Sequence, residues 1–399
     1  MTQKESPDII DATSGNKTWT RNLIILAVAV FLLSLGMGLQ NGVNTNFIQE
    51  LGLSGSQVLM QSGIREIPGL CLVFVAALIM HLPLVWRSVA AVLIMGIGFT
   101  LYSAVHSWSG LVVVSLIGSL GLHLFMPLNN ALGLNLAAKQ NSGKILGTLG
   151  AVGALASMAG IGIIILLSHW LSLRVLIGTA GGLIILAAIV LTRLPKNIGE
   201  TRKSQPRLLF RKRYWLYYVL LLFEGSRTQV FAAFNLMVLV YDYGLSAMQI
   251  SILLLTSGLV NLLFSQRLGH LLDIAGERVT LTIGYIALAL CFVGYALINN
   301  VWLLGLMVVF INLLVTLSMG LSTYVNRIAP PEELTPTLSI GVSFNHITSV
   351  GMSFVAGSLL PIVGYKALCW GAVVIIAASV PFAMAIRTKI QRPALETTN

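Results

Sequence analysis

Residues 22–48, NLIILAVAVFLLSLGMGLQNGVNTNFI, contain no charged side chain and form one continuous, mostly apolar stretch. A helix that crosses the hydrocarbon core of a bilayer needs about 20 predominantly apolar residues, so this stretch is long enough. Further runs of the same kind follow, separated by short polar breaks, at about 56–81, 86–105, 109–137, 143–170, 172–193, 214–242, 247–268, 279–298, 301–326, 334–363 and 366–387. The sequence therefore predicts an all-α membrane protein with twelve transmembrane helices, tilted or kinked where Gly or Pro interrupts them.

The overall composition agrees with a chain that is surrounded by lipid. Of the 399 residues, 56% are hydrophobic and 9% are charged, whereas a soluble domain is about 25% charged. This composition excludes a soluble enzyme and a nucleic-acid-binding domain. No phosphate-binding G-x-x-x-x-G-K-[ST] motif and no H-E-x-x-H zinc motif occur, and the three cysteines form no C-x-x-C pair. We therefore expect neither direct use of ATP, nor enzyme activity, nor a cofactor or metal site.

The basic residues predict how the chain is oriented. The net charge is +11, and most Lys and Arg residues fall in the tails, in alternate loops and in the central segment, on one side of the predicted helices. The positive-inside rule places that side, with both termini, in the cytoplasm, as in a bacterial inner (plasma) membrane protein. We predict tails at 1–21 and 388–399, a basic linker at 194–213, and six-helix bundles at 22–193 and 214–387. The cluster RLLFRKRYW at 207–215 is also compatible with binding of anionic lipid.

A weak internal repeat relates the two bundles. GLSGSQ at 52–57 and GLSAMQ at 244–249 precede corresponding helices, and Gly150 and Gly160 recur at nearly the same offset as Gly341 and Gly351. A shared offset favours duplication of a six-helix unit, so the two bundles should be pseudo-symmetric.

The stretch GHLLDIAGER at 269–278 resembles the signature loop of the major facilitator superfamily of secondary transporters, roughly G-x-L-x-D-x-x-G-x-x-R/K. The corresponding stretch in the first half, HLPLVWRSVA at 81–90, keeps only Arg87 of that pattern. The resemblance implies two six-helix bundles that rock about a central site. It also implies that Gly269, Asp273, Gly276 and Arg278 act at a cytoplasmic gate.

Four charged residues fall inside the predicted helices: Arg65, Glu66, Glu224 and Arg227. A charge at the centre of a membrane helix costs about 2.5–3.5 kcal/mol on insertion scales, so such groups usually have a function. Three hypotheses remain open. The arginines pair with the glutamates as structural ties, or an arginine binds a polar or anionic substrate while a glutamate carries protons, or the pairs form in only one conformation.

Other polar groups lie at similar depths. His123 and His346 are either hydrogen-bonded packing groups or proton relays, and the amides either bind a solute or join helices. Our predicted proton-coupling residues are Glu66 and Glu224. Our predicted translocation path consists of Asn41, Asn44, Arg65, His123, Asn130, Arg227, Asn312 and His346.

These observations predict a secondary active transporter that moves a small polar or anionic solute by alternating access. Protons are favoured over sodium as the coupling ion, and we expect a monomer that binds no nucleic acid. Under this hypothesis Glu224→Gln should abolish uptake driven by a pH gradient. The alternative is a transporter-like protein that no longer transports and instead senses a ligand or acts as a scaffold.

Overall fold

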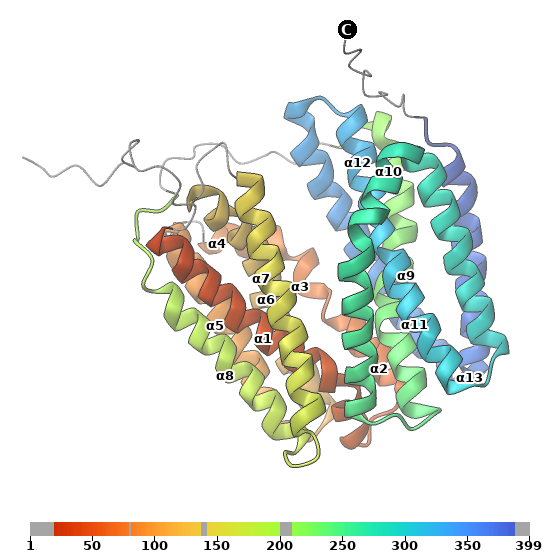
Figure 1. Ribbon diagram of the computed structural model, residues 1–399, viewed down its shortest axis with the longest axis horizontal. Helices are drawn as coiled ribbons and strands as arrows, with labels where there is room; N and C mark the ends of the chain where they lie inside the picture. The colour runs from red at the N-terminus through yellow and green to blue at the C-terminus, as the bar shows by residue number, and fades with distance from the viewer. Residues whose placement is uncertain (1–19, 80, 137–141, 200–209, 388–399) are drawn as a thin grey trace, which may run out of the picture.

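The computed structural model describes residues 20–79, 81–136, 142–199 and 210–387. Across these ranges the chain is helical apart from turns and short connections, and it contains no strand there, which confirms the predicted all-α class (Figure 1). The predicted tails at 1–21 and 388–399 lie almost entirely outside the described residues, as does the middle of the linker at 200–209.

Each of the twelve predicted segments overlaps a helix or one leg of a bent helix. In the first half the helices are α1 (Arg21–Glu50), α2 (Gly55–Ile64), α3 (Ile67–Leu70), α4 (Leu72–Ile79), α5 (Leu84–Tyr102), α6 (Trp108–Leu136), α7 (Ser142–Leu167) and α8 (Leu173–Leu191). In the second half they are η2 (Lys212–Tyr214), α9 (Trp215–Tyr241), α10 (Ala247–Leu297), α11 (Val301–Val315), η3 (Thr316–Ser318), α12 (Met319–Ile328) and α13 (Pro331–Met384). Within the described residues, eight helical stretches are long and apolar enough to cross a membrane.

Helices α10 and α13 each contain two legs. Gly276 in α10 has φ 77°, and Gly364 in α13 has φ 74°, so the backbone reverses at each glycine. Only glycine adopts this left-handed region without a steric penalty from a Cβ atom. These single-residue turns explain why two predicted segments fall on each of these long helices.

The helices form two groups (Figure 1). In the first group α1 packs against α7 and α8, and α5 packs against α6 and α8; in the second, α13 packs against α9 and α10. The groups touch where α2 meets α9 and α13, and where α7 meets α10. We call the end where α1 begins and α13 ends the terminal end, and the opposite end, with the turns at 51–54 and 242–246, the far end. The groups diverge toward the terminal end.

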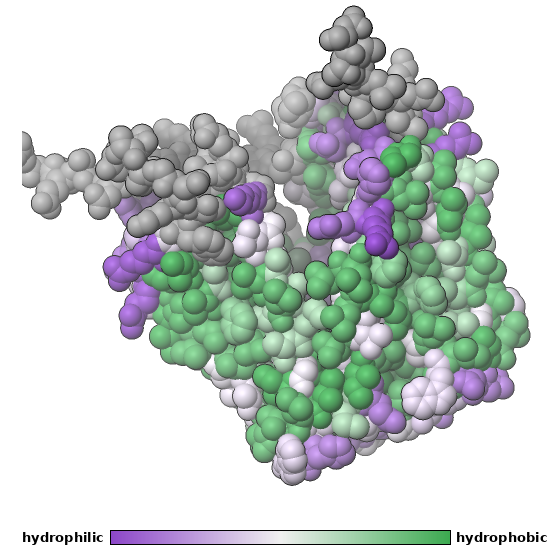
Figure 2. Space-filling model, viewed as in Figure 1, coloured by the Kyte–Doolittle hydropathy of each residue, from purple (hydrophilic) through white to green (hydrophobic). Residues whose placement is uncertain are grey.

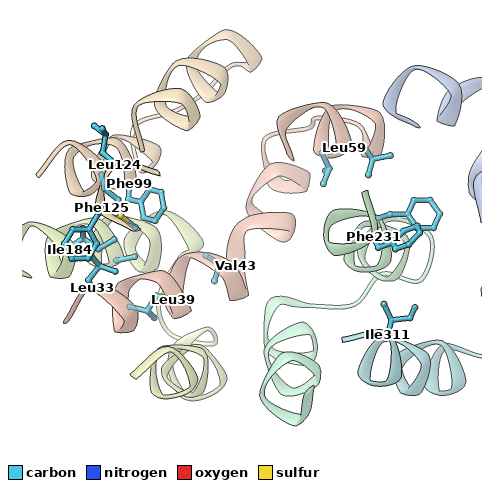
Figure 3. Packing of buried hydrophobic residues seen from close by; sticks show 14 of the residues in the cluster. Leu33, Leu39, Val43, Leu59, Phe99, Leu124, Phe125, Ile184, Phe231 and Ile311 are labelled. Atoms are coloured by element: carbon cyan, nitrogen blue, oxygen red, sulfur yellow. The ribbon is translucent and has the colours of Figure 1, made fainter. Parts of the chain in front are cut away.

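The surface and the interior are both apolar, as expected for a protein in lipid. Figure 2 shows a broad hydrophobic belt bounded by hydrophilic residues, and a hollow between the two groups at the terminal end. Figure 3 shows Leu33, Phe99 and Ile184 packed within the first group, whereas Leu59 of α2 lies on the side of Phe231, beside the second group. Helix α2 therefore carries residues of the first half to the boundary with the second.

The end of the linker is attached to the start of α13. Arg213 and the hydroxyl of Tyr214 both donate to Glu333, the latter over 2.8 Å. The hydrogen bond from Arg213 lowers the pKa of the Glu333 carboxyl. Glu333 is therefore ionised over the physiological range and holds the linker end against the second group.

Glycines allow α1 and α7 to approach closely. A methyl group at Gly160 of α7 would lie 3.2 Å from the Gly38 Cα and 3.0 Å from the Leu39 amide nitrogen, and closer still to the Leu35 carbonyl oxygen. Small residues at such positions let membrane helices pack through their backbones. Two residues further along, on the other side of the same helix, a methyl group at Gly162 would meet nothing within 4 Å.

This difference gives a matched pair of substitutions. We expect Gly160→Ala to destabilise the protein by about 1–3 kcal/mol, the usual cost of overpacking. Gly162→Ala should be neutral or stabilise by up to about 1 kcal/mol, because alanine favours the helix. Thermal unfolding of the two purified variants in detergent measures both effects, and equal melting temperatures would contradict the close α1–α7 contact.

Candidate functional site

The candidate site begins at a break in the second predicted span. Pro68 lacks a backbone N–H and cannot continue a helix through this position, so α2 ends at Ile64 and α3 begins at Ile67. Arg65 and Glu66 occupy the turn between them. The Ser119 hydroxyl of α6 donates to the Arg65 carbonyl oxygen, which stabilises the broken backbone. The break thus places two adjacent, opposite charges at the boundary between the groups.

A pocket of about 350 Å³ lies at this boundary. Both groups of helices contribute to its wall, and most of its polar side chains are amides. The lining residues are Asn41, Asn44, Thr45, Val58, Gln61, Ser62, Arg65, Glu66, Leu122, Ala233, Asn235, Leu236, Leu254, Val308 and Asn312. Amides offer both donors and acceptors, and Arg65 and Glu66 add one basic and one acidic group, so the wall can form hydrogen bonds with a small polar molecule.

Several of these amides are held in place by neighbours. Gln61 donates to the Tyr102 hydroxyl over 3.1 Å and to the Ser115 hydroxyl over 3.0 Å. Asn44 accepts from Gln40 over 3.0 Å, and Asn312 donates to the Val308 carbonyl oxygen over 3.0 Å. Fixed amides bind a ligand at a smaller entropic cost than mobile ones.

Beside the pocket, Glu66 meets two histidines. Its Oε2 lies 2.7 Å from Nδ1 of His346 on α13 and 3.9 Å from Nε2 of His123 on α6. The two imidazole centres are 5.1 Å apart. The rings fit because Gly69 has no side chain: a Cβ there would lie 2.8 Å from a carbon of each ring. Glu66 and His123 belong to the first group and His346 to the second, so the cluster bridges the boundary.

The other intramembrane pair lies elsewhere. Arg227 donates to Glu224 one turn earlier on α9, its guanidinium carbon is 3.9 Å from the centre of the Tyr285 ring, and Nη1 is 3.5 Å from the Ser379 hydroxyl. Arg227 is 3% exposed and Glu224 is 6% exposed. Both residues are enclosed within the second group, away from the pocket lining. Neither residue is among the lining residues of this pocket, so the roles of Arg227 in the path and of Glu224 in proton coupling stay predictions.

Among the remaining predicted residues, Asn41, Asn44, Arg65 and Asn312 line the pocket. Asn130 is exposed on α6, two turns beyond His123. Asn41, Asn44 and Arg65 of the first half therefore share the pocket with Asn312 of the second half, whereas Asn130 is not among the lining residues.

The predicted gate motif differs from its expected arrangement. Residues 269–275 continue the first leg of α10 instead of forming a loop, and the reversal falls at Gly276 alone. Asp273 and Arg278 are exposed. The ion pair at this turn joins the fully buried Glu277 to Arg327 of α12, with Oε1 and Nε 2.6 Å apart.

Gln61 and Asn235 in the pocket wall, and the Glu277–Arg327 pair, are not among the residues predicted from the sequence. The sequence does indicate that Gln61 faces the same way as Arg65, because Gln57, Gln61 and Arg65 are four residues apart and share one face of a helix. No local sequence pattern indicates the cluster of Glu66, His123 and His346, because its members lie far apart in the chain.

At the far end the two groups are joined by hydrogen bonds that end on backbone oxygens. Asn46 donates to the Leu245 carbonyl over 2.8 Å, Gln49 to that of Val240 over 3.2 Å, and Tyr241 to that of Leu53 over 2.7 Å. The Ser56 hydroxyl donates to the Gly357 carbonyl in the same region. We call these four contacts the far-end closure.

The described residues thus form two helical groups with a polar pocket between them, and hydrogen bonds join the groups at the far end. The sequence matches the profile of the Major Facilitator Superfamily over residues 26–333. The chain belongs to this superfamily.

Solved structures support the same fold. The nucleoside transporter NupG superposes with a TM-score of 0.74 at 16% identity, covering 92% of this chain and 98% of that chain. A D-xylose-proton symporter gives 0.72 at 14% identity, covering 92% and 98%. A bacterial homologue of the human lysosomal transporter Spinster, in an inward-facing and occupied conformation, gives 0.67 at 14% identity, covering 91% and 95%. Comparison with curated protein sequences finds no match.

Proposed function

We propose that this chain is a secondary active transporter that moves a small polar or anionic solute by alternating access, coupled to protons. The observation that carries the proposal is the amide-lined pocket at the boundary, because side chains of both groups form its wall. Rocking of the bundles at 22–193 and 214–387 would expose such a pocket to each side of the membrane in turn.

The far-end closure and the hollow at the terminal end correspond to one state of that cycle. The distribution of basic residues supports a cytoplasmic terminal end, in the plasma membrane of a bacterium. In this orientation the pocket is closed toward the outside, as in an inward-facing transporter. The chain would act as a monomer, since the pocket is complete within it.

We assign Arg65 to solute binding and Glu66 to proton coupling. Arg65 is the cationic member of the pocket lining. Glu66 shares that lining and also contacts His346 of the other group, so a change in its charge would alter an interaction between the two moving bodies. The same fold occurs in a D-xylose-proton symporter, which supports proton coupling as a property of the proposed transporter.

Reconstitution in liposomes tests the proposal. Purified protein should accumulate a radiolabelled solute from a panel of sugars, nucleosides and small carboxylates when the lumen is alkaline and the outside is acidic. Collapse of the gradient with a protonophore should release the solute. Saturable binding of a panel member without flux would instead identify a sensor, and Arg65→Ala should reduce binding in either case.

Opening of the far end can be tested separately. We expect Asn46→Ala to increase labelling of a cysteine placed at Asn44 by a maleimide reagent added from the far side, because the bond to Leu245 is lost. Asn299→Ala is the matched control: Asn299 accepts from Lys366 at the same end but within the second group. Equal labelling in the two variants would contradict a role for Asn46 in closure.

A further inference from the structure

We propose that Glu66, His123 and His346 form a binding site for one divalent transition-metal ion of the zinc class. Each residue offers one ligand atom, and the three atoms lie within 4.8 Å of one another. This inference goes beyond the proposed function, because binding of the ion requires neither a solute nor a gradient.

The distances from Glu66 to the two histidines bracket the spacing of ligand atoms around a coordinated ion. Zinc binds imidazole nitrogen and carboxylate oxygen at about 2.0–2.2 Å in a tetrahedral arrangement, which separates neighbouring ligand atoms by roughly 3.4 Å. Around Glu66 Oε2, the Nδ1 of His346 is 2.7 Å away and the Nε2 of His123 is 3.9 Å away. Small rotations of the side chains would lengthen the first distance and shorten the second to reach this geometry.

One imidazole already has the orientation that a metal ligand requires. A metal-bound histidine usually donates its other ring N–H to a carbonyl or carboxylate, which fixes its tautomer. The Nδ1 of His123 lies 2.9 Å from the Ser119 carbonyl oxygen. With its proton on Nδ1, His123 directs the lone pair of Nε2 toward Glu66.

The burial of the ligands and the space around the two rings also favour a preformed metal-binding site. Glu66 is 8% exposed and His123 is 7% exposed. The absence of a side chain at Gly69 lets both rings lie against the backbone of α3.

A set of two nitrogens and one oxygen suits zinc, cobalt or nickel, whereas calcium takes six to eight oxygen ligands. Three protein ligands leave a fourth position for water or for a solute group, as in open zinc sites.

The site has a mechanical consequence. Glu66 and His123 belong to the first group and His346 to the second, so an ion held by all three would join the groups in the conformation described here. Arg65 is adjacent to Glu66 and lines the same pocket. Its positive charge opposes a cation, and Arg65→Gln should therefore strengthen metal binding.

A cobalt titration tests the site. Full-length protein in detergent is freed of metal with a chelator and titrated with Co²⁺, whose visible absorption reports tetrahedral nitrogen and oxygen ligands. We expect one Co²⁺ per chain, displaced by Zn²⁺. His123→Gln and His346→Gln should each weaken binding by at least about tenfold, because the loss of even an outer-shell partner weakens metal sites by that much.

His106→Gln provides the matched control. His106 is exposed in the connection between α5 and α6 and lies outside the cluster, so the affinity of this variant should equal that of the unaltered protein. Absence of Co²⁺ binding by the unaltered protein would overturn the proposal, whatever the variants do. Unchanged affinity in both cluster variants, or weaker binding by Arg65→Gln, would also overturn it. Transport assays are independent of these results, so failure of the metal site leaves the proposed transport function standing.

Discussion

Glu66→Gln is expected to reduce proton-driven accumulation of solute to the level of liposomes without protein, while the variant remains folded. Glutamine is close to glutamate in size and can hydrogen-bond to His346, so packing at the break between α2 and α3 is retained. It cannot change its charge, and the interaction between the two groups then no longer depends on a proton. Uptake of a transported solute under an imposed pH gradient measures the effect.

Two comparisons make this test specific. Exchange of labelled for unlabelled solute without a gradient should persist in Glu66→Gln, because exchange needs the pocket but no net proton movement. Glu50→Gln, which alters an exposed carboxylate at the end of α1, should accumulate solute normally. Normal accumulation by Glu66→Gln would refute the assigned proton role.

Glu224→Gln is expected to destabilise the protein by about 3–5 kcal/mol, the usual cost of removing one partner of a buried ion pair. Arg227 is 3% exposed and would remain in the interior of the second group without its carboxylate partner. Little folded protein should survive extraction, and its melting temperature should fall. Size-exclusion chromatography of heated detergent samples measures both.

The double substitution Glu224→Gln with Arg227→Met provides the control, because it removes both charges and should recover much of the lost stability. This prediction differs from the expectation based on sequence, in which Glu224 carried protons. A Glu224→Gln variant as stable as the unaltered protein but unable to use a pH gradient would restore that earlier hypothesis.

Much of the fold could be predicted from the sequence because lipid imposes a simple rule. Each crossing needs a long apolar helix, so the lengths of the apolar runs located α1, α5, α6, α7 and α8 directly. The turns inside α10 and α13 were harder to place. Each depends on the backbone angle of one glycine, Gly276 or Gly364, and other glycines in the same runs do not turn the chain.

The site could be predicted only in part. Helical spacing shows which residues share a face, and it correctly grouped Glu224 with Arg227 on α9. Spacing along one helix does not show which other helix its polar face contacts. In the structure Arg227 of this pair contacts Tyr285 and Ser379, which are not among the residues that line the pocket. The contact between Glu66 and His346 depends on how two distant helices pack, which no local pattern encodes.

The far-end closure has an evolutionary consequence. All four of its acceptors are main-chain oxygens, at positions 53, 240, 245 and 357, and every amino acid supplies such an oxygen. A substitution at any of these four positions therefore leaves the acceptor in place, provided that the backbone conformation is unchanged. Purifying selection on these hydrogen bonds should therefore fall on the donors Asn46, Gln49, Ser56 and Tyr241. The acceptor positions are constrained by packing instead, as at Gly357, where a Cβ atom would lie 2.9 Å from the Ser56 carbonyl oxygen.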